Sequence, residues 1–463
     1  MTRHFLLFLV PLLLTGCALA VAPRAPQPET LPATFSQQGE APLPARWWEA
    51  FNDPQLSALI TEALQENPSL QATRQRLRAA VAVARQSDAD SALSLDASAN
   101  GSVTRQQQSS RQSDSQSLTL GLAASYEVDL WGGIEATQRA AHLDAEASAE
   151  NLRTAAITLS AEVATAWYEL ISQRKRQQQL EHEIALEEES LTLLRQQVRR
   201  GFTPLATLRA QQLQLESLKS GLAERRALLT SSARQLAILL GRSDIAALPT
   251  GDLPSLPPLP QTGLPAKSLK ERPDLRAAWL QVLAADARVT ASTSERFPRL
   301  SLGTTLQSGS DSVSALVDDW LARLVANLTL PLLDGGARRA AVEASAASRD
   351  AALHDYAAAL LAAFAEIEEA LQRERHGGES LLHLERQLPL ARQSLEQAQS
   401  TYRHGAGTYS DLLDARLTVV RLEEEILLAR QERLNQRITL CRALGGGWPL
   451  SDEIPSDPKG IEK

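Results

Sequence analysis

The stretch YRHGAGTYSDLLDAR, Tyr402 to Arg416, interrupts a long run of residues that otherwise carry a helical pattern. Its glycines, Gly405 and Gly407, permit the left-handed backbone that ends a helix, and Thr408 is suited to begin the next one. We therefore expect the chain to reverse sharply here between two long helices.

An earlier stretch, VRRGFTPLATLRAQ, repeats this turn and places Gly201 204 residues before Gly405, with Thr203 and Pro204 starting the following helix. Two other pairs of segments keep nearly the same offset. NPSLQATRQRL at Asn67 matches RPDLRAAWLQV at Arg272, and DLWGG ending at Gly133 matches PLLDGG ending at Gly336. Matches in register across half the chain indicate a duplicated unit.

Each half carries the same order of patterns: a helix, two strands, a very long helix, a sharp turn and another long helix. Apolar side chains alternate with polar or small ones in the expected strands, which is the pattern of a sheet with one apolar face. Polar loops, 105–117 and 307–319, are expected within each strand pair. The strands are expected at about 91-105, 117-130, 298-309 and 320-333, and the long helices at about 134-200, 204-241, 337-403 and 408-444.

The long helices carry seven-residue seams, which predict helices supercoiled side by side. One series of positions spaced seven residues apart in the first half is apolar except for Gln177. In another series, Arg433 of the second half stands at the position that Leu229 occupies in the first. A neighbouring line ends at Cys441, for which we expect a packing role. The apolar members named here are Val163, Leu170, Ile184, Leu191, Val198, Leu208, Leu215, Leu222 and Leu236.

The first residues, MTRHFLLFLVPLLLTGCALA, have a charged start, an apolar run and a small-residue exit, as secretory signals do. The ending LTGC resembles the lipobox of bacterial lipoproteins, which implies that Cys17 becomes the acylated first residue of the mature protein. Ala18 stands where an inner-membrane retention signal would have Asp, so the resemblance implies sorting to the outer membrane.

The sequence divides into segments at its proline-rich stretches and at the two copies of the repeat. The expected segments are a lipoprotein signal peptide, 1-16; a proline-rich anchor segment with the first helix of an equatorial belt around the long helices, 17-66; a first repeat, 67-247; a proline-rich linker, 248-266; a second repeat, 267-444; and a tail, 445-463.

Composition argues against two broad classes of function. The net charge is −8 and the cations are scattered through helical patterns, so a nucleic-acid partner is not expected. The seven histidines are isolated, and no nucleophile has a base beside it. We expect no enzyme, no catalytic residue, no metal site and no cofactor other than a lipid on Cys17.

Four amphipathic strands cannot close a membrane barrel alone, because open edges are not tolerated in hydrocarbon. The chain would therefore pool strands with copies of itself. Two copies would give eight strands and a filled interior, and three would give twelve strands and a polar lumen. Trp131 and Phe297 at one end and Trp320 at the other are placed as interfacial aromatics. The alternative is a soluble amphipathic sheet that covers a helical bundle.

The order of these motifs resembles the TolC-like outer-membrane efflux proteins, and among them the lipid-anchored branch similar to OprM and NodT. The resemblance covers nearly the whole mature chain, from WWEAFNDPQLSALITEAL through ERPDLRAAWLQVLAADARV to LCRALGGGW. It implies a mainly α chain that closes as a homotrimer, with a 12-stranded β-barrel in the outer membrane on a long periplasmic α-barrel. The implied activity is a passive exit duct for drugs or other small toxic compounds, completed by a periplasmic adaptor protein and an inner-membrane pump.

The same resemblance gives the hairpin tips a role. It implies that Gly201, Thr203, Gly405, Gly407 and Thr408 form the end at which adaptor hairpins dock, although turn chemistry alone also explains them. It further implies that Asp411, Asp414 and Tyr402 constrict the periplasmic aperture, and the alternative for the two aspartates is favourable charge near a helix N-terminus. Ser410 departs from the pattern, which has Leu there.

Two other functions remain open from the sequence. A duct for type I protein secretion would use the same architecture, and neighbouring genes would separate the two. A lipid-anchored coiled-coil scaffold would explain the heptads and Cys17, but it leaves the paired amphipathic strands unexplained.

Overall fold

The computed structural model describes residues 32–44, 46–108, 111–244, 249, 251–316 and 319–446. The expected signal peptide, Cys17 and nearly all of the expected tail lie outside these ranges. The described chain divides into two compact units. Of the described residues, the strand unit comprises Arg76–Ala149 and Arg276–Ala358, and the hairpin unit comprises 32–75, Glu150–Leu275 and 359–446.

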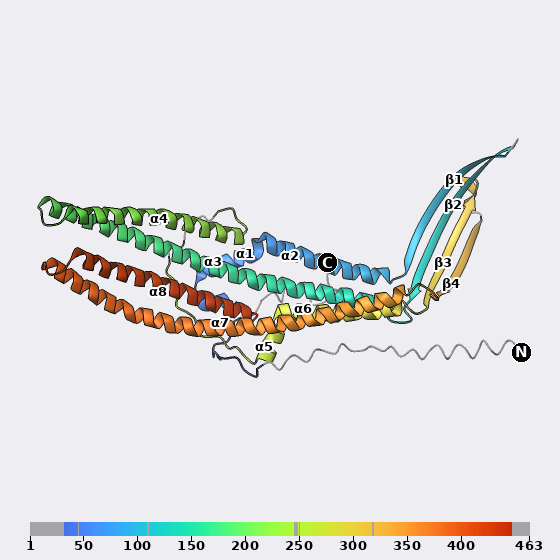
Figure 1. The fold of residues 1–463 in the computed structure, drawn as a ribbon. Helices are drawn as coiled ribbons and strands as arrows, with labels where there is room; N and C mark the ends of the chain where they lie inside the picture. Colours follow the sequence, from blue (N-terminus) through green and yellow to red (C-terminus); the bar gives the residue numbers. More distant parts are fainter. Residues whose placement is uncertain are drawn as a thin grey trace. The chain divides into compact units, whose positions relative to one another are not determined.

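The strand unit contains one antiparallel sheet in the order β1-β2-β3-β4 (Figure 1). Each half of the chain contributes a pair of neighbouring strands, as the duplicated pattern predicts. The strands are β1, Ser94–Gln108; β2, Arg111–Val128; β3, Arg299–Ser310; and β4, Trp320–Thr329.

Two strand ends differ from those expected, each for a backbone reason. The first strand begins at Ser94 and not at 91, because helix α2 continues to Asp90 and the Ala92 N–H then bonds to the Ala89 carbonyl. The last strand ends at Thr329 and not at 333. Pro331 follows it, and a proline has no N–H to give to a strand ladder.

The expected polar loop at 105–117 was wrong for most of its length. β1 and β2 pair through this segment as far as Gln108 and Arg111. The ladder is made by backbone groups, so it can continue through Gln and Ser where side-chain alternation no longer reveals it. At the second loop, β3 likewise extends to Ser310, and a short 3-10 helix, η3, follows at Val313–Ala315.

The register aligns the apolar positions of all four strands on one face. Leu122 pairs with Ala97 on β1 and with Leu306 on β3, and Leu306 pairs with Ala322 on β4. Paired residues share a face, so each strand adds to the same apolar surface. That face also contains Leu95, Ala99, Val103, Leu118, Leu120, Ala124, Tyr126, Val128, Leu300, Leu302, Leu324, Ala326 and Leu328.

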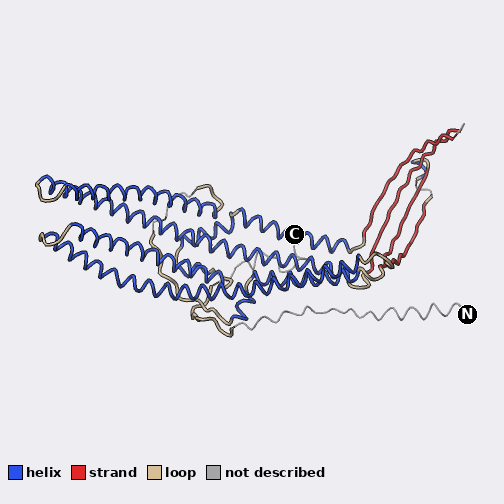
Figure 2. Tube along the Cα trace, viewed as in Figure 1, coloured by secondary structure: helices blue, strands red, loops and turns tan. Residues whose placement is uncertain are grey.

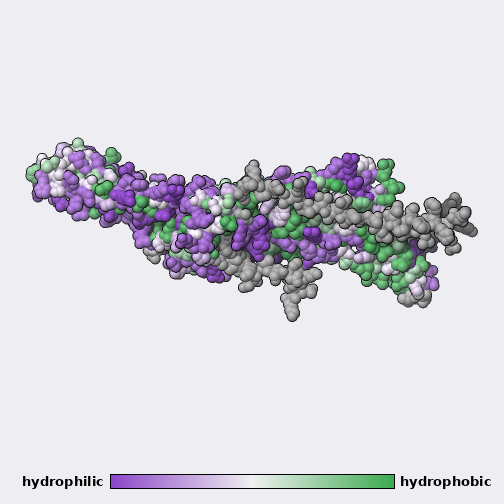
Figure 3. All heavy atoms as spheres, turned by 90° about the horizontal axis from the view of Figure 1, so that it is seen from below, coloured by the Kyte–Doolittle hydropathy of each residue, from purple (hydrophilic) through white to green (hydrophobic). Residues whose placement is uncertain are grey.

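The opposite face of the sheet is mainly polar, with Asp96, Asn100, Glu127, Gln307 and Arg323 among its side chains. Many leucines of the apolar face are exposed, Leu324 to 83%. Figure 3 shows hydrophobic residues gathered over the strands, whereas the surface of the helical hairpins is mostly hydrophilic. The sheet therefore has one face suited to an apolar medium and one suited to water.

Two helical hairpins dominate the hairpin unit (Figure 2). The first hairpin is formed by α3, Gly133–Arg199, and α4, Leu205–Leu239. The second is formed by α7, Ala337–Arg403, and α8, Tyr409–Ala443. α3 and α7 contribute their first residues to the strand unit. The shorter helices are η2, Trp47–Phe51; α1, Pro54–Glu66; α2, Pro68–Asp90; α5, Pro265–Glu271; and α6, Pro273–Ser294.

The heptad seams form the apolar cores of both hairpins. In the first, Ile184, Leu191 and Leu215 pack with Leu180, Leu208, Leu218 and Leu222. In the second, Ala391, Val419 and Leu422 pack with Leu384, Leu388 and Leu395. Most members of one cluster lie 204 residues from a member of the other, so the repeat extends to core packing. Cys441 is buried, and burial raises the pKa of its thiol to about 12.

Two extended connectors lie against the second hairpin. A parallel bridge joins Ala41 to Pro260, and the Phe35 ring stacks on Phe364 of α7 at 5.6 Å. Arg437 of α8 fixes the later connector by donating to the Pro258 carbonyl at 2.6 Å and to the Pro257 carbonyl. Its guanidinium also pairs with both carboxylate oxygens of Glu374 on α7.

Among the described residues, no helix combines the length and the apolar character needed to cross a membrane.

We predict that Arg437→Met lowers the thermal stability of the hairpin unit. Arg437 is 2% exposed and Glu374 8%, so the variant leaves a carboxylate buried without its cation, a change that typically costs about 3–5 kcal/mol. Loss of the helical circular dichroism signal on heating measures the effect. The double variant Arg437→Met/Glu374→Leu should recover much of the loss. A double variant no more stable than the single one would contradict the account.

Candidate functional site

The first hairpin tip ends α3 with a left-handed glycine. Gly201 has φ +77°, and the Phe202 N–H bonds back to the Gln197 carbonyl at 2.9 Å, which closes a Schellman motif. A Cβ at Gly201 would meet nothing within 4 Å, so its backbone conformation is what requires glycine there. Phe202 follows with 77% of its surface exposed, and Pro204 is the N-cap of α4.

The second tip repeats this geometry residue by residue. Gly405 has φ +73°, and the Ala406 N–H bonds to the Thr401 carbonyl at 2.9 Å. Gly407 has another reason to be small, because a Cβ there would lie 3.0 Å from the Thr401 hydroxyl oxygen. Both tips are therefore compact turns that expose backbone.

Thr408 and Asp411 form a capping box at the start of α8. The Thr408 hydroxyl accepts from the Asp411 N–H at 3.2 Å, while the Asp411 carboxylate accepts from the Thr408 N–H at 3.1 Å and its hydroxyl at 2.7 Å. The hydrogen bond from the Thr408 side chain, followed by that from its backbone, lowers the pKa of Asp411. The Asp411 carboxylate is thus occupied by the capping box that begins α8.

Asp414 lies one turn further along α8 and is exposed, as is Ser410. Among the described residues no donor contacts the Asp414 carboxylate. Its backbone carbonyl accepts from the Thr418 hydroxyl at 2.8 Å, as expected within a helix. Of the two aspartates, Asp414 is therefore the one whose carboxylate is open to other groups.

Tyr402 joins the two hairpins just behind their tips. Its hydroxyl donates to the Gln197 side-chain oxygen at 3.3 Å, and the same oxygen accepts from Thr203 at 3.1 Å. The Tyr402 ring meets Tyr409 edge to face at 5.7 Å, and the Tyr409 hydroxyl lies 3.2 Å from that of Ser190 on α3. Hydrogen bonds and one ring contact thus connect residues from α3, α7, α8 and the first turn.

Further along the hairpins, ion pairs join α8 to α3 and α4. Arg416 donates to Glu187 at 3.5 Å, and Glu424 accepts from Arg176 at 2.6 Å and from Arg225. Burial raises the pKa of Glu187, although Arg416 opposes it. Burial also acts to raise the pKa of Glu424, but the hydrogen bond and charge of Arg176 and the charge of Arg225 outweigh it, so that pKa is lowered.

Gln197, Glu187 and Glu424 are functional-site residues that were not predicted from the sequence. Glu187 could have been found, because it lies seven residues from both Leu180 and Leu194 and so places a charge in a line of apolar seam positions. The Gln197 contact has no comparable signal, since its partner Tyr402 is 205 residues away.

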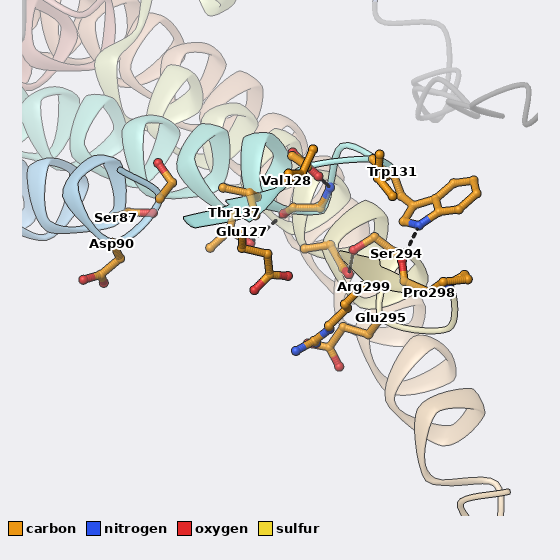
Figure 4. Close-up of a pocket in the computed structure, with 16 residues that line it drawn as sticks. Ser87, Asp90, Glu127, Val128, Trp131, Thr137, Ser294, Glu295, Pro298 and Arg299 are labelled. Atoms are coloured by element: carbon orange, nitrogen blue, oxygen red, sulfur yellow. Dashed lines mark hydrogen bonds and ion pairs between the residues drawn. The ribbon is translucent and has the colours of Figure 1, made fainter. Parts of the chain in front are cut away.

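A separate cavity of about 310 Å³ lies within the strand unit and contains none of the predicted site residues (Figure 4). Trp131 borders it, stacking on Phe297 at 4.8 Å and donating from its indole nitrogen to the Pro298 carbonyl at 2.8 Å. Glu295 lies 3.7 Å from Arg299 at the same cavity. The Trp131 contacts thus join the segment that follows β2 to the segment between α6 and β3.

A family model described as outer membrane efflux protein matches residues 59–242 and 264–446, one stretch in each repeat. The chain is 31% identical over 441 residues to the pyoverdine export outer membrane protein OpmQ of Pseudomonas aeruginosa, covering 90% of this chain and 89% of that protein. It is 29% identical over 490 residues to the toluene efflux pump outer membrane protein TtgF of Pseudomonas putida, covering 99% of each.

Among solved structures, the chain is similar to the outer-membrane channel OprN. The TM-score is 0.85 with 27% sequence identity, over 93% of this chain and 99% of that one. Both repeats, each with its own pair of strands, therefore fall within the shared fold.

We predict opposite pH responses for Glu424→Gln and Glu187→Gln. Glu424 has a lowered pKa, so its stabilisation is present above its unfolded pKa and is lost as pH falls through the folded value. Its replacement should cost about 1 kcal/mol at neutral pH, because partial exposure screens the pairs. Glu187 has a raised pKa, so its ionised form opposes folding as pH rises, and Glu187→Gln should be neutral or stabilising at pH 7.

Thermal melts of both variants between about pH 4 and pH 8 check this difference. Destabilisation by Glu187→Gln at neutral pH, or a Glu424→Gln defect of constant size down to pH 4, would contradict the assignment.

Proposed function

The chain belongs to the outer membrane efflux protein family, and from this premise we propose that it is the exit duct of a tripartite system for drugs or other small toxic compounds. It is an outer-membrane efflux channel, and its activity is passage and not chemistry.

The continuous apolar face of the four-stranded sheet carries this proposal. On β2 it runs from Leu118 to Val128, about 34 Å along a strand, or roughly 25 Å high at the usual tilt, which is the height of a barrel's lipid-facing band. β1 and β4 are the two edges of the described sheet. Three copies paired edge to edge supply twelve strands with a polar interior, so we propose a homotrimer.

The hairpin tips are proposed as the docking surface for a periplasmic adaptor protein, through which an inner-membrane pump delivers cargo. The glycines at 201, 405 and 407 leave backbone exposed, and Thr203 and Thr408 border the same turns. Phe202, 77% exposed at the first tip, offers an apolar anchor that such a partner could cover.

We propose that Asp414 and Tyr402 form the periplasmic aperture, with Asp411 in a supporting role. In a trimer an inward-facing Asp414 becomes a ring of three carboxylates, which attracts cations and disfavours anions. The hydrogen bond from Tyr402 to Gln197 holds the second hairpin against the first, so opening would require this contact to break. Asp411 already caps α8, so it would fix the turn that positions Asp414.

We propose that Cys17, which lies outside the described residues, carries a lipid anchor, and the LTGC pattern supports its acylation. We propose the residues from 17 to 66 as the anchor segment and first belt helix. The linker at 248-266 is proposed as another part of this equatorial belt, supported by the bridge between Ala41 and Pro260.

The cargo is proposed at the level of chemical class only. One relative is named for the export of pyoverdine and another for the efflux of toluene, and this chain aligns with most of the length of each. Because similar channels are named for such different compounds, we propose that the pump, and not the duct, selects the cargo.

We predict a trimer in mild detergent whose electrophoretic mobility changes on heating. Leu324→Lys, on the apolar face, should reduce the yield of trimer in the outer membrane, because Lys facing lipid costs about 2–4 kcal/mol near the midplane. Asn327→Lys on the polar face is the matched control and should assemble normally. A stable monomer without membrane association would refute the duct.

We predict that Cys17→Ser abolishes incorporation of labelled fatty acid into the chain. The serine hydroxyl cannot form the thioether through which such lipoproteins are anchored. Label retained on the variant would show that the lipobox interpretation is wrong.

We predict that Asp414→Ala raises single-channel conductance and weakens block by multivalent cations. Asp411→Ala is the informative comparison, because its main effect should be a weakened start of α8 and not a change in block. Planar bilayer recordings measure both. Unchanged block in the Asp414 variant would remove this residue from the aperture.

A further inference from the structure

A groove of about 1330 Å³ lies in the hairpin unit, lined by residues of α3, α7, α8 and the linker segment 252–256. It is separate from the tips and from the aperture residues. Its apolar lining consists of Leu253, Pro254, Leu256, Leu381, Leu388, Pro389, Ile426, Leu427 and Leu434. A volume of this size leaves room for a hydrocarbon chain along the apolar lining.

The charged residues at the groove do not balance. Its lining contains four cations and three carboxylates. Arg392 pairs with Glu423 at 2.7 Å, Arg430 with Glu385 at 2.7 Å, and Lys175 with Asp252. Arg433 is the remaining cation, and among the described residues no carboxylate oxygen lies within 4.0 Å of its nitrogens.

Arg433 also has an unmet hydrogen-bonding need. Its Nε is buried and has no acceptor, whereas the rest of the side chain is half-buried. A buried N–H without a partner is costly, and a guanidinium is well suited to bind a carboxylate or a phosphate. The groove thus offers an unpaired cation beside an apolar surface.

The surrounding backbone is shaped to hold Arg433. Gly377 and Gly378 stand in the middle of α7, where glycine weakens a helix. A Cβ at Gly378 would lie 3.5 Å from Nη2 of Arg433, and a Cβ at Gly377 would lie 2.9 Å from the Gln436 side-chain oxygen. The first hairpin has Gln173 and Arg174 at the matching positions, and buried Leu229 in place of Arg433.

We propose that this groove binds an amphiphilic anion, with the anionic head on Arg433 and the hydrocarbon chain along the leucines of α7, α8 and the linker. The head is a carboxylate or a phosphate, so a free fatty acid and a lipid are both possible sources. The site is independent of transport through the duct, and neither its presence nor its absence alters the argument for the channel.

The test uses the full-length protein in nanodiscs of phosphatidylcholine. The probe is dodecanoate carrying a photoreactive diazirine, and cross-linked peptides are identified by mass spectrometry. Label is expected on residues 381–392 and 423–434. Unlabelled dodecanoate or dodecyl phosphate should compete at least about ten times better than dodecanol, since a charge-assisted hydrogen bond distinguishes them. Stronger competition by dodecanoate would indicate a fatty acid as the natural ligand, and stronger competition by dodecyl phosphate would indicate a phosphate-bearing lipid.

Arg433→Leu should reduce labelling about tenfold, and Arg386→Leu, an exposed arginine of α7 outside the groove lining, should not. Leu427→Trp, which fills the groove and keeps the charge, should also reduce it. Label placed elsewhere, equal competition by dodecanol, or unchanged labelling of Arg433→Leu would each overturn the proposal. Cross-linking of the groove to a second copy of the chain in place of the probe would overturn it as well.

Discussion

Backbone hydrogen bonding at the edges of the four-stranded sheet is the constraint on which the rest of the molecule depends. Each edge strand carries N–H and C=O groups that hydrocarbon cannot satisfy. The apolar face on which Leu122, Leu306 and Ala322 lie in register is suited to such a medium, while the opposite face carries Asp96, Glu127 and Arg323. A chain with this sheet requires partners for β1 and β4, and the proposed homotrimer supplies them with twelve strands and a polar lumen.

The duplication gives the two helical hairpins a common plan, against which their differences can be recognised. Both tips use the same Schellman geometry at Gly201 and Gly405, and both hairpins use matching leucine clusters. The proposed aperture and the proposed anion site lie where the two copies diverge. The second hairpin alone has the Thr408–Asp411 capping box, the open carboxylate of Asp414 and the unpaired Arg433 against Gly377 and Gly378. A polar contact through Tyr402, Gln197 and Thr203 joins the divergent tip to its counterpart.

Sequence reasoning predicted the elements well where side chains repeat with a regular period. The heptads gave the long helices within a residue or two, and alternation gave the four strands. It failed at 105–117, because a strand ladder is made by the backbone and can continue through Gln and Ser. Contacts such as Arg437 with Glu374 and the proline carbonyls were also beyond prediction, since they join segments far apart in the chain and follow no period. Glu187 could have been noticed as a charge in an apolar seam.

Single cysteines placed along β2 from Ser117 to Val128 test the central claim most directly, with an environment-sensitive label read in outer-membrane vesicles. The account predicts strict alternation: labels at 118, 120, 122, 124, 126 and 128 report lipid, and those at 119, 121, 123, 125 and 127 report water. Labels that report water on both faces, or show no alternation, would contradict a membrane-embedded sheet closed by further copies of the chain.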